Sequence, residues 1–313
     1  MAKDSKTCCP LCGHEDNYIA EALSFAAIKK IYRKQFKIII DDGLDEIALH
    51  VCRNCGLKFY TPALTGGERF YEGLQKYDWY YMADKAEYKT AAGFVPPAGD
   101  VLEIGAGRGQ FRRHINCGSY TGLEFSANAI EMAKRDNVLI YNQSIGEHAG
   151  SNGGRYDVVC AFQVLEHVAD AREFLSSAVK CLKTGGRLII SVPNESGFTG
   201  CETNNVLNMP PHHVTRWTDT CLINMAGLFN LKLVALDYET LSDMHLRPYG
   251  ICMAQDAIKK ILGMKKSQID RLFFFFPVRL LVRVLAMIPM SGLREAGMRP
   301  RGHSVTAVYE KLP

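Results

Sequence analysis

The stretch from Val101 to Phe111, VLEIGAGRGQF, decides the fold class of this 313-residue chain. A short apolar run leads into three alternate glycines, Gly105, Gly107 and Gly109, and a helical pattern follows them. Glycines between a strand and a helix let the backbone turn tightly and approach a ligand closely. Glu124, about 20 positions further along the chain, is spaced to hydrogen-bond ribose hydroxyls. The stretch therefore predicts a loop that binds a nucleoside cofactor.

The same loop disfavours a dinucleotide such as NAD. The glycine pattern of dinucleotide-binding loops requires Gly where this chain has Gln110. The carboxylate of Glu103, just before the glycines, would also repel a pyrophosphate.

Strand and helix patterns alternate around and after this loop. Apolar runs predict strands over 119–126, 138–144, 155–162 and 186–194, and amphipathic spacing predicts helices over 109–115, 127–136 and 170–182. Strands that alternate with helices form a doubly wound parallel sheet, which binds ligands beyond the carboxyl ends of its strands. We therefore expect the site in the loops that follow the strands.

Four motifs in this order, VLEIGAGRGQF, GLEFS, YDVVCAFQVLEHV and CLKTGGRLIISVPN, resemble those of class I S-adenosylmethionine-dependent methyltransferases. LKLVALDYETL and GHSVTAVYEKL further along the chain resemble the antiparallel sixth and seventh strands that end this fold. The resemblance implies an α/β, Rossmann-like fold with a seven-stranded sheet. It also implies S-adenosylmethionine as the cofactor and methyl transfer as the reaction.

The resemblance also implies a set of cofactor-binding residues in the loops after the strands. The glycines would approach the methionine part, the acid after the second strand would hold the ribose, and the acid before the glycines would orient the loop or contact the ammonium group. Three residues would border the adenine, and two would lie under the cofactor after the fourth strand. In chain order the set is Glu103, Gly105, Gly107, Gly109, Glu124, Phe125, Ser144, Ile145, Phe162 and Gln163.

Two C-x-x-C pairs near the N-terminus predict a metal site. Cys9 and Cys12 form one pair, Cys52 and Cys55 the other, and a glycine follows each pair. Two such turns can aim four thiolates at one ion, and four cysteines fill a tetrahedral shell, so we expect structural zinc in a module over residues 1–65. The long loop between the pairs should hold a helix within 20–36 and a strand over 46–52. Cys8 and His14 are alternative ligands.

This N-terminal module resembles that of zinc-bearing methyltransferases that act on sugars, including the sugar C-methyltransferases. The chain departs from the C-methyltransferases because it ends soon after the seventh strand, without their additional C-terminal domain. That departure favours oxygen or nitrogen as the acceptor atom. We expect methylation of a sugar or glycan hydroxyl, on a nucleotide- or lipid-linked carrier. Methylation of carbon or nitrogen on a nucleotide sugar, methylation of RNA, and a non-catalytic binding role are the alternatives.

The stretch PPHHVTRW follows the fifth strand and therefore lies on the cofactor side of the sheet. A hydroxyl acceptor must lose a proton, and histidine suits that role near neutral pH. His213 is the first candidate base and His212 the second, although His213 could instead cap a helix that starts at Thr218, and a metal site is a third interpretation. His167, after the fourth strand, is the rival base, and Glu166 beside it could help to hold a divalent ion.

Two further segments fall outside these motifs. An aromatic-rich stretch over 66–99 is expected to be a helical connector that packs the zinc module on the methyltransferase domain at 100–313. A helical insertion over 241–300 precedes the last strand, and residues 247–301 carry eleven Lys or Arg against three acids. Its centre, 272–290, is an amphipathic helix interrupted by Arg279 and Arg283, so it could form a basic lid or a peripheral membrane contact.

The composition limits the remaining function classes. The N-terminus has no apolar run that would make a signal peptide, and no stretch reaches the length of a membrane span. An odd number of cysteines, eleven, also favours a reducing compartment, so we expect a cytoplasmic location, with contact to the cytoplasmic face of a membrane as a second option. The net charge of +4 does not by itself imply a polyanionic partner. No basic cluster surrounds the two C-x-x-C pairs, so nucleic acid is an unlikely binding partner.

Overall fold

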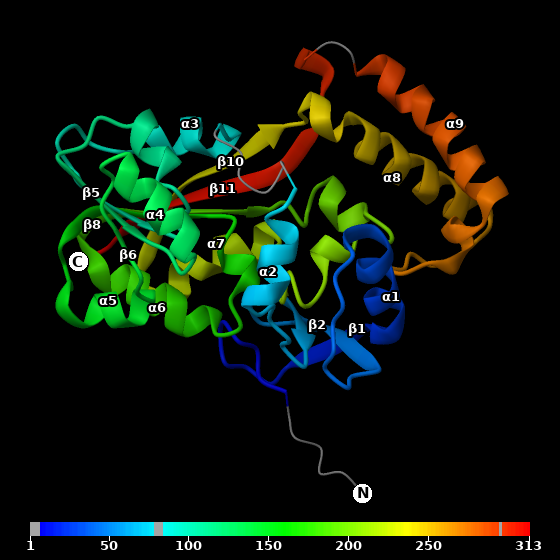
Figure 1. The fold of residues 1–313 in the computed structure, drawn as a ribbon, viewed down its shortest axis with the longest axis horizontal. Helices are drawn as coiled ribbons and strands as arrows, with labels where there is room; N and C mark the ends of the chain where they lie inside the picture. The colour runs from blue at the N-terminus through cyan, green and yellow to red at the C-terminus, as the bar shows by residue number, and fades with distance from the viewer. Residues whose placement is uncertain (1–6, 78–83, 294–295) are drawn as a thin grey trace, which may run out of the picture.

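A seven-stranded sheet forms the centre of the molecule in the computed structural model, which describes residues 7–77, 84–293 and 296–313 (Figure 1). The strand order is β10-β11-β8-β7-β4-β5-β6. The strands from β4 to β8 are parallel, and β11 lies antiparallel between β8 and β10. The predicted α/β sheet with an antiparallel pair at its end is therefore confirmed. The strands are β4 (Asp100–Ile104), β5 (Ser119–Leu123), β6 (Ile140–Tyr141), β7 (Tyr156–Phe162), β8 (Leu182–Pro193), β10 (Leu231–Thr240) and β11 (Arg301–Lys311).

Helices cover both faces of this sheet, and most begin at a side-chain cap. Ser126, Ser144, Asp170 and Thr218 each accept a hydrogen bond from the backbone of the following helix, which satisfies an N–H that has no partner within the helix. The stretch predicted as a helix over 109–115 is instead a short 3₁₀ helix. The elements are η1 (Gln110–His114), α4 (Ala127–Arg135), α5 (Ile145–Ser151), η2 (Leu165–His167), α6 (Ala171–Cys181) and α7 (Asp219–Leu228).

The first 61 residues contribute three strands to a second, four-stranded sheet of order β1-β2-β3-β9. The helix predicted within 20–36 begins later, because Ser24 ends strand β1 and caps α1. The strand predicted over 46–52 is present with those bounds. The elements are β1 (Asn17–Ser24), α1 (Phe25–Phe36), β2 (Glu46–Cys52), β3 (Lys58–Thr61) and β9 (Thr215–Arg216).

The connector over 66–99 contains two short helices, α2 (Glu68–Leu74) and α3 (Ala86–Ala92). Phe70 of α2 packs edge-on against Tyr32 of α1, and Tyr88 of α3 packs against Phe162 of β7. The two helices of the connector therefore pack on different units, α2 on the N-terminal unit and α3 on the main sheet. The aromatic residues at 79–81 lie outside the described residues.

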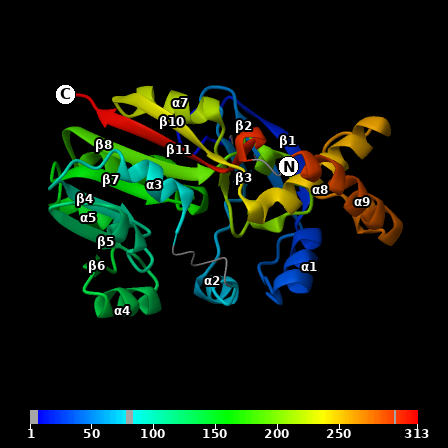
Figure 2. The ribbon, with the colours of Figure 1, turned by 90° about the horizontal axis from the view of Figure 1, so that it is seen from above.

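The helical insertion predicted over 241–300 is present before the last strand, and its two long helices form a hairpin. It consists of α8 (Asp243–Ile261), η5 (Arg271–Phe274), α9 (Phe276–Gly292) and η6 (Ala296–Met298). Figures 1 and 2 show α8 and α9 side by side at the end of the molecule opposite β5 and β6. Gly250 permits this contact, because a Cβ there would lie 2.7 Å from the carbonyl oxygen of Ala286. No helix in the described ranges has both the length and the apolar character that a bilayer span requires.

Candidate functional site

The glycine loop after β4 has the backbone geometry that the sequence predicts. Gly105, Gly107 and Gly109 have φ angles of +70°, +52° and +72°, which disfavour other residues. A Cβ at Gly105 or Gly109 would lie 2.4 or 2.6 Å from a valine methyl group, whereas a Cβ at Gly107 would meet nothing within 4 Å. The outer glycines therefore permit packing, and the middle glycine faces open space where a ligand can approach.

Glu124, after β5, holds this loop through hydrogen bonds to the backbone. One carboxylate oxygen accepts from the amide of Gly107 at 2.9 Å, and the other accepts from the amides of Phe125 and Ser126, each at 2.8 Å. A carboxylate offers about four acceptor positions, so capacity remains for a hydroxyl. Phe125 is 69% exposed beside it, an unusual position for a large aromatic ring. The two residues together offer a polar and an apolar contact to a nucleoside.

Glu103 lies inside the protein at the end of β4. Its side chain is 1% exposed and accepts a hydrogen bond from the hydroxyl of Tyr120. Burial raises the pKa of Glu103 to about 8, although the Tyr120 hydrogen bond opposes the shift. The residue can therefore support the loop from below, and it would ionise more readily beside a cation.

The other predicted cofactor residues occupy the ends of the neighbouring strands. Ser144 caps α5 and forms a capping box with Glu147, and Ile145 is buried behind it. Phe162 packs into the core against Phe111 at 4.9 Å between ring centroids. Gln163 follows β7 with a φ of +58°, a conformation that is uncommon outside glycine and that often marks a functional position.

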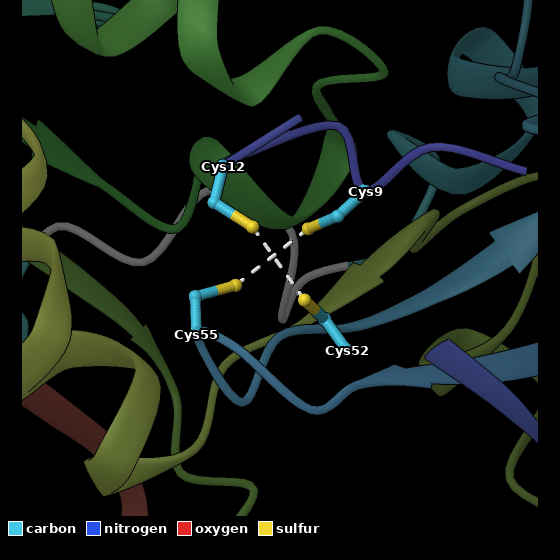
Figure 3. A group of neighbouring side chains, drawn as sticks. All are labelled: Cys9, Cys12, Cys52 and Cys55. Carbon is cyan, nitrogen blue, oxygen red and sulfur yellow. Dashed lines mark hydrogen bonds between the residues drawn. The ribbon is translucent and has the colours of Figure 1, made fainter. Parts of the chain in front are cut away.

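Four buried cysteines gather where the N-terminal segment meets the main sheet (Figure 3). The sulfurs of Cys9 and Cys55 lie 3.6 Å apart, those of Cys12 and Cys52 lie 3.5 Å apart, and all four lie within 4.8 Å of one another. Tetrahedral zinc with bonds of about 2.3 Å requires sulfurs about 3.8 Å apart, so the cluster fits the ion. Cys8 is exposed and is not part of the group.

The knuckles are built into the main core of the protein. The four cysteines share one buried apolar cluster with Leu57, Trp217 and the residues of β4, β7 and β8. The guanidinium group of Arg172, at the start of α6, donates to the carbonyl oxygens of Leu11 and Cys12 at 2.9 and 3.0 Å. A change at the cysteines should therefore reach the main sheet.

Three histidines meet at the carboxyl edge of the main sheet. His167 comes from η2, and His212 and His213 come from the segment that leads into β9. Their ring centroids are 4.5 to 4.9 Å apart, and one nitrogen of each ring lies within 4.8 Å of the others. Burial lowers the pKa of His167 to about 4 and that of His212 to about 3, and it lowers the pKa of His213 as well. All three rings are therefore neutral near pH 7.

Glu166 lies beside these rings and is 1% exposed. Its Oε1 is 3.9 Å from Nε2 of His167 and 4.0 Å from Nε2 of His213. Both carboxylate oxygens are buried and accept no hydrogen bond from any residue in the described ranges. Burial raises the pKa of Glu166 to about 8. An unpartnered carboxyl group beside neutral imidazoles is costly to bury, so Glu166 is a candidate binding residue.

Sequence reasoning missed two groups next to these histidines. The hydroxyl of Tyr71, from α2, lies 3.5 Å from Nδ1 of His167, and only the aromatic bias of the connector hinted at it. Glu195, just after β8, binds both Lys58 at 2.8 Å and Arg216 at 2.7 Å. Although burial opposes it, these two cations hold the pKa of Glu195 below its usual range. An acid directly after a predicted strand was a signal that could have identified it.

A small enclosed cavity of about 10 Å³ lies between these groups. Its lining includes Glu166, Glu195, His213 and Arg216, and its volume is roughly that of one water. His212 and His213 are 8% and 7% exposed, whereas the side chain of His167 is 22% exposed. Of the three rings, that of His167 is therefore the most accessible to an acceptor.

Comparisons with known proteins find a family model and curated relatives that match this chain. The model of a methyltransferase domain family matches residues 75–236, just over half of the chain. The ubiquinone biosynthesis O-methyltransferase of Erwinia tasmaniensis is 31% identical over 104 residues, which is 31% of this chain and 43% of that protein. The corresponding protein of Sodalis glossinidius is 28% identical over 165 residues, covering 46% of this chain and 66% of the relative.

This chain thus spans less than half the length of the first curated relatives that it matches. Among solved structures, an S-adenosylmethionine-dependent methyltransferase from Archaeoglobus fulgidus is similar, with 17% sequence identity and a TM-score of 0.46. That similarity covers 72% of this chain and 92% of the other.

Proposed function

Since this chain belongs to the methyltransferase domain family and is an S-adenosylmethionine-dependent methyltransferase, we propose that it methylates a hydroxyl group. The acceptor that we propose is a sugar or glycan on a nucleotide- or lipid-linked carrier. One observation carries the proposal: the histidine cluster and the glycine loop lie at the same edge of the sheet. The glycine loop follows β4 and His167 follows β7, and these two strands are adjacent and parallel, paired through Ala161 and Ile104.

The reaction is an in-line displacement at the methyl carbon of the sulfonium. The acceptor oxygen forms the new C–O bond while the C–S bond breaks, its electron pair stays on sulfur, and S-adenosylhomocysteine leaves. The hydroxyl proton must also leave. Alignment of the two reactants can supply an effective molarity on the order of 10⁵ M. The histidine cluster would accept the proton of the acceptor hydroxyl.

Within the cluster we place His167 closest to the acceptor, because its side chain is the most exposed of the three. Its Nδ1 lies 2.6 Å from the carbonyl oxygen of His212, so Nδ1 carries the hydrogen and Nε2 keeps a lone pair. Sequence reasoning had placed His213 first, and its deeper position supports an orienting role.

We propose that the cofactor lies along the glycine loop. Gly107 would admit the methionine part, Glu124 would accept a ribose hydroxyl, and Phe125 would cover the adenine on its exposed side. Ser144 and Ile145 would border the ring at the start of α5, and Gln163 would approach the cofactor from below.

Oxygen is the acceptor atom that the relatives support. Their printed names describe O-methyltransferases, and a buried cluster of neutral imidazoles is more useful to a hydroxyl than to an amine that is already deprotonated. Methylation of carbon, nitrogen or RNA and a purely binding role are the outcomes that would replace this proposal.

We also propose that Cys9, Cys12, Cys52 and Cys55 bind one structural zinc ion. All four are buried, the group has no open side for a substrate, and its spacing fits tetrahedral thiolate ligation. The ion would fix the turn at Gly56, which contacts the residues that begin α7.

The exposed face of α9 is proposed to dock on an anionic lipid surface, which would suit a lipid-linked acceptor. Phe276, Leu280, Val284 and Met287 are 53–72% exposed and share one helical face. Arg279 and Arg283 flank that face, and α9 contains no acidic residue. An apolar face with basic flanks is typical of helices that lie in a membrane interface.

Replacing Glu124 with Ala is expected to weaken S-adenosylmethionine binding by roughly 1.5 to 3 kcal/mol, or about 10- to 150-fold, because a hydrogen bond to a charged group is lost. Isothermal titration calorimetry measures the change. The matched control is Glu131→Ala, an exposed acid on α4 that should leave the affinity unchanged. Equal affinities for wild type and Glu124→Ala would contradict the proposed ribose contact.

Replacing Cys52 with Ser is expected to abolish binding of the zinc ion and to destabilise the whole chain. Structural zinc supplies roughly 10 kcal/mol or more, comparable to the stability of an entire domain. Elemental analysis and thermal unfolding provide the readouts. Cys8→Ser, which changes an exposed neighbouring thiol, should retain one zinc per chain. Carefully purified wild type without zinc would refute the assignment.

Replacing His167 with Ala is expected to lower kcat by about 10² to 10⁴, with little change in the affinity for S-adenosylmethionine, because the acceptor proton loses its recipient. His213→Ala should lower kcat less. The assay follows labelled methyl transfer to sugar nucleotides and lipid-linked glycans. Full activity of His167→Ala, together with loss of activity in His213→Ala, would move the proton acceptor to the segment before β9.

The wild-type protein is expected to float with vesicles that contain phosphatidylglycerol and to bind far less to pure phosphatidylcholine vesicles. Leu280→Glu and the pair Arg279→Glu with Arg283→Glu should each reduce flotation at least tenfold. The control is Arg33→Glu, an exposed basic residue on α1. The proposal fails if no vesicle binds, or if the same face instead forms a dimer of this chain.

A further inference from the structure

The cluster of His167, His212, His213 and Glu166 has the donor set of a metal site that is separate from the four cysteines. Each histidine offers a ring nitrogen, and these nitrogens lie within 4.8 Å of one another. Glu166 adds a carboxylate oxygen at 3.9 and 4.0 Å from two of the rings. Four ligands around one ion at bonds of about 2.1 Å lie roughly 3.4 Å apart, so each would move inward by less than about 1 Å.

The hydrogen bonds around the cluster occupy Nδ1 of His167 and of His212 and leave Nε2 of each ring free to bind a metal ion. His167 Nδ1 donates to the carbonyl oxygen of His212, and His212 Nδ1 donates to that of Leu207 at 2.9 Å. Metal-binding histidines usually make this kind of bond through the nitrogen that does not bind the metal, because it fixes the ring and directs the other lone pair to the ion. The Nε2 atoms of both rings are therefore available.

The buried carboxyl group of Glu166, which lacks a hydrogen-bond partner, is a second and independent indication of a cation site. The carboxyl group is 1% exposed, and neither oxygen accepts a hydrogen bond from the described part of the chain. A buried carboxyl group without a partner is rare in folded proteins and calls for a cation or a bound ligand. No Lys or Arg in the described ranges forms an ion pair with it.

We propose that these four side chains bind one divalent transition-metal ion, such as Zn²⁺, Fe²⁺ or Ni²⁺. Three imidazoles favour these ions over Mg²⁺ or Ca²⁺, which prefer oxygen ligands. Four protein ligands still permit a fifth position on a transition metal. The partly exposed ring of His167 would leave that position open to an acceptor.

The location of the ion gives it a role in catalysis, and this part of the inference rests on the proposed function. An acceptor hydroxyl in the fifth position would bind the metal through oxygen, which lowers its pKa. The proton would leave to solvent or to a neighbouring base, and the oxygen would be held for attack on the methyl carbon. With the ion bound, the Nε2 lone pair of His167 would be a metal ligand and would not take the proton, so the loss of activity expected for His167→Ala would come from loss of the ion.

Metal binding is tested on the full chain with its cysteine site already filled with zinc. Calorimetric titration with Zn²⁺ should reveal a second equivalent, and His167→Ala, His213→Ala and Glu166→Gln should each weaken it at least tenfold while the first zinc stays. His245→Ala is the control, because this imidazole stacks on His303 outside the cluster. A missing second equivalent, or equal binding by the variants, would overturn the site.

Cobalt distinguishes the two sites if a variant fails to fold. Co²⁺ added to the zinc-filled wild type should give visible ligand-field bands without the charge-transfer absorption of thiolate ligands. No Co²⁺ binding, or a thiolate spectrum, would overturn the proposal.

Methyl transfer is measured in the same preparations. Transfer without a second ion would refute the catalytic role of the metal and leave the proposed function standing, whereas a second ion without transfer to any hydroxyl would refute the proposed function alone.

Discussion

The backbone of Val214 is hydrogen-bonded to both halves of the molecule, and the histidine site depends on this double attachment. Its amide donates to the carbonyl oxygen of Glu166 at 2.9 Å, and its carbonyl oxygen accepts from the amide of Tyr60 at 3.0 Å. The next two residues form β9, which pairs with β3 of the N-terminal sheet. The segment is thus fixed between two sheets, and His213 is held against Glu166.

This attachment explains why a cysteine-rich segment precedes a methyltransferase sheet. Cys55 and Gly56 lead directly into β3, the strand that holds β9. Lys58 of β3 and Arg216 of β9 both bind Glu195, so the charged network follows the same path. The N-terminal unit therefore contacts and positions the segment that carries two of the three histidines.

The sequence predicted the parts of this protein that depend on local pattern. The glycine loop, the parallel strands and the C-x-x-C pairs were all recognisable, because each needs particular residue types at short spacing. What it could not reveal depends on distant contacts: β9 has two residues and forms only because β3 is beside it. Likewise, His167 and His212 are 45 positions apart, and only the fold brings their rings to 4.6 Å. The helix predicted within 20–36 began too early because pairing with β2 turns its first residues into a strand.

The central claim is that this enzyme places a methyl group on a hydroxyl oxygen at the edge formed by the glycine loop and the histidine cluster. The most direct measurement uses S-adenosylmethionine with an isotopically labelled methyl group and a panel of sugar nucleotides, lipid-linked glycans and phenols. Mass spectrometry and NMR of the product then locate the label. We predict a labelled methyl ether on one class of acceptor. Label on carbon or nitrogen, or S-adenosylmethionine bound without transfer to any acceptor, would contradict the account.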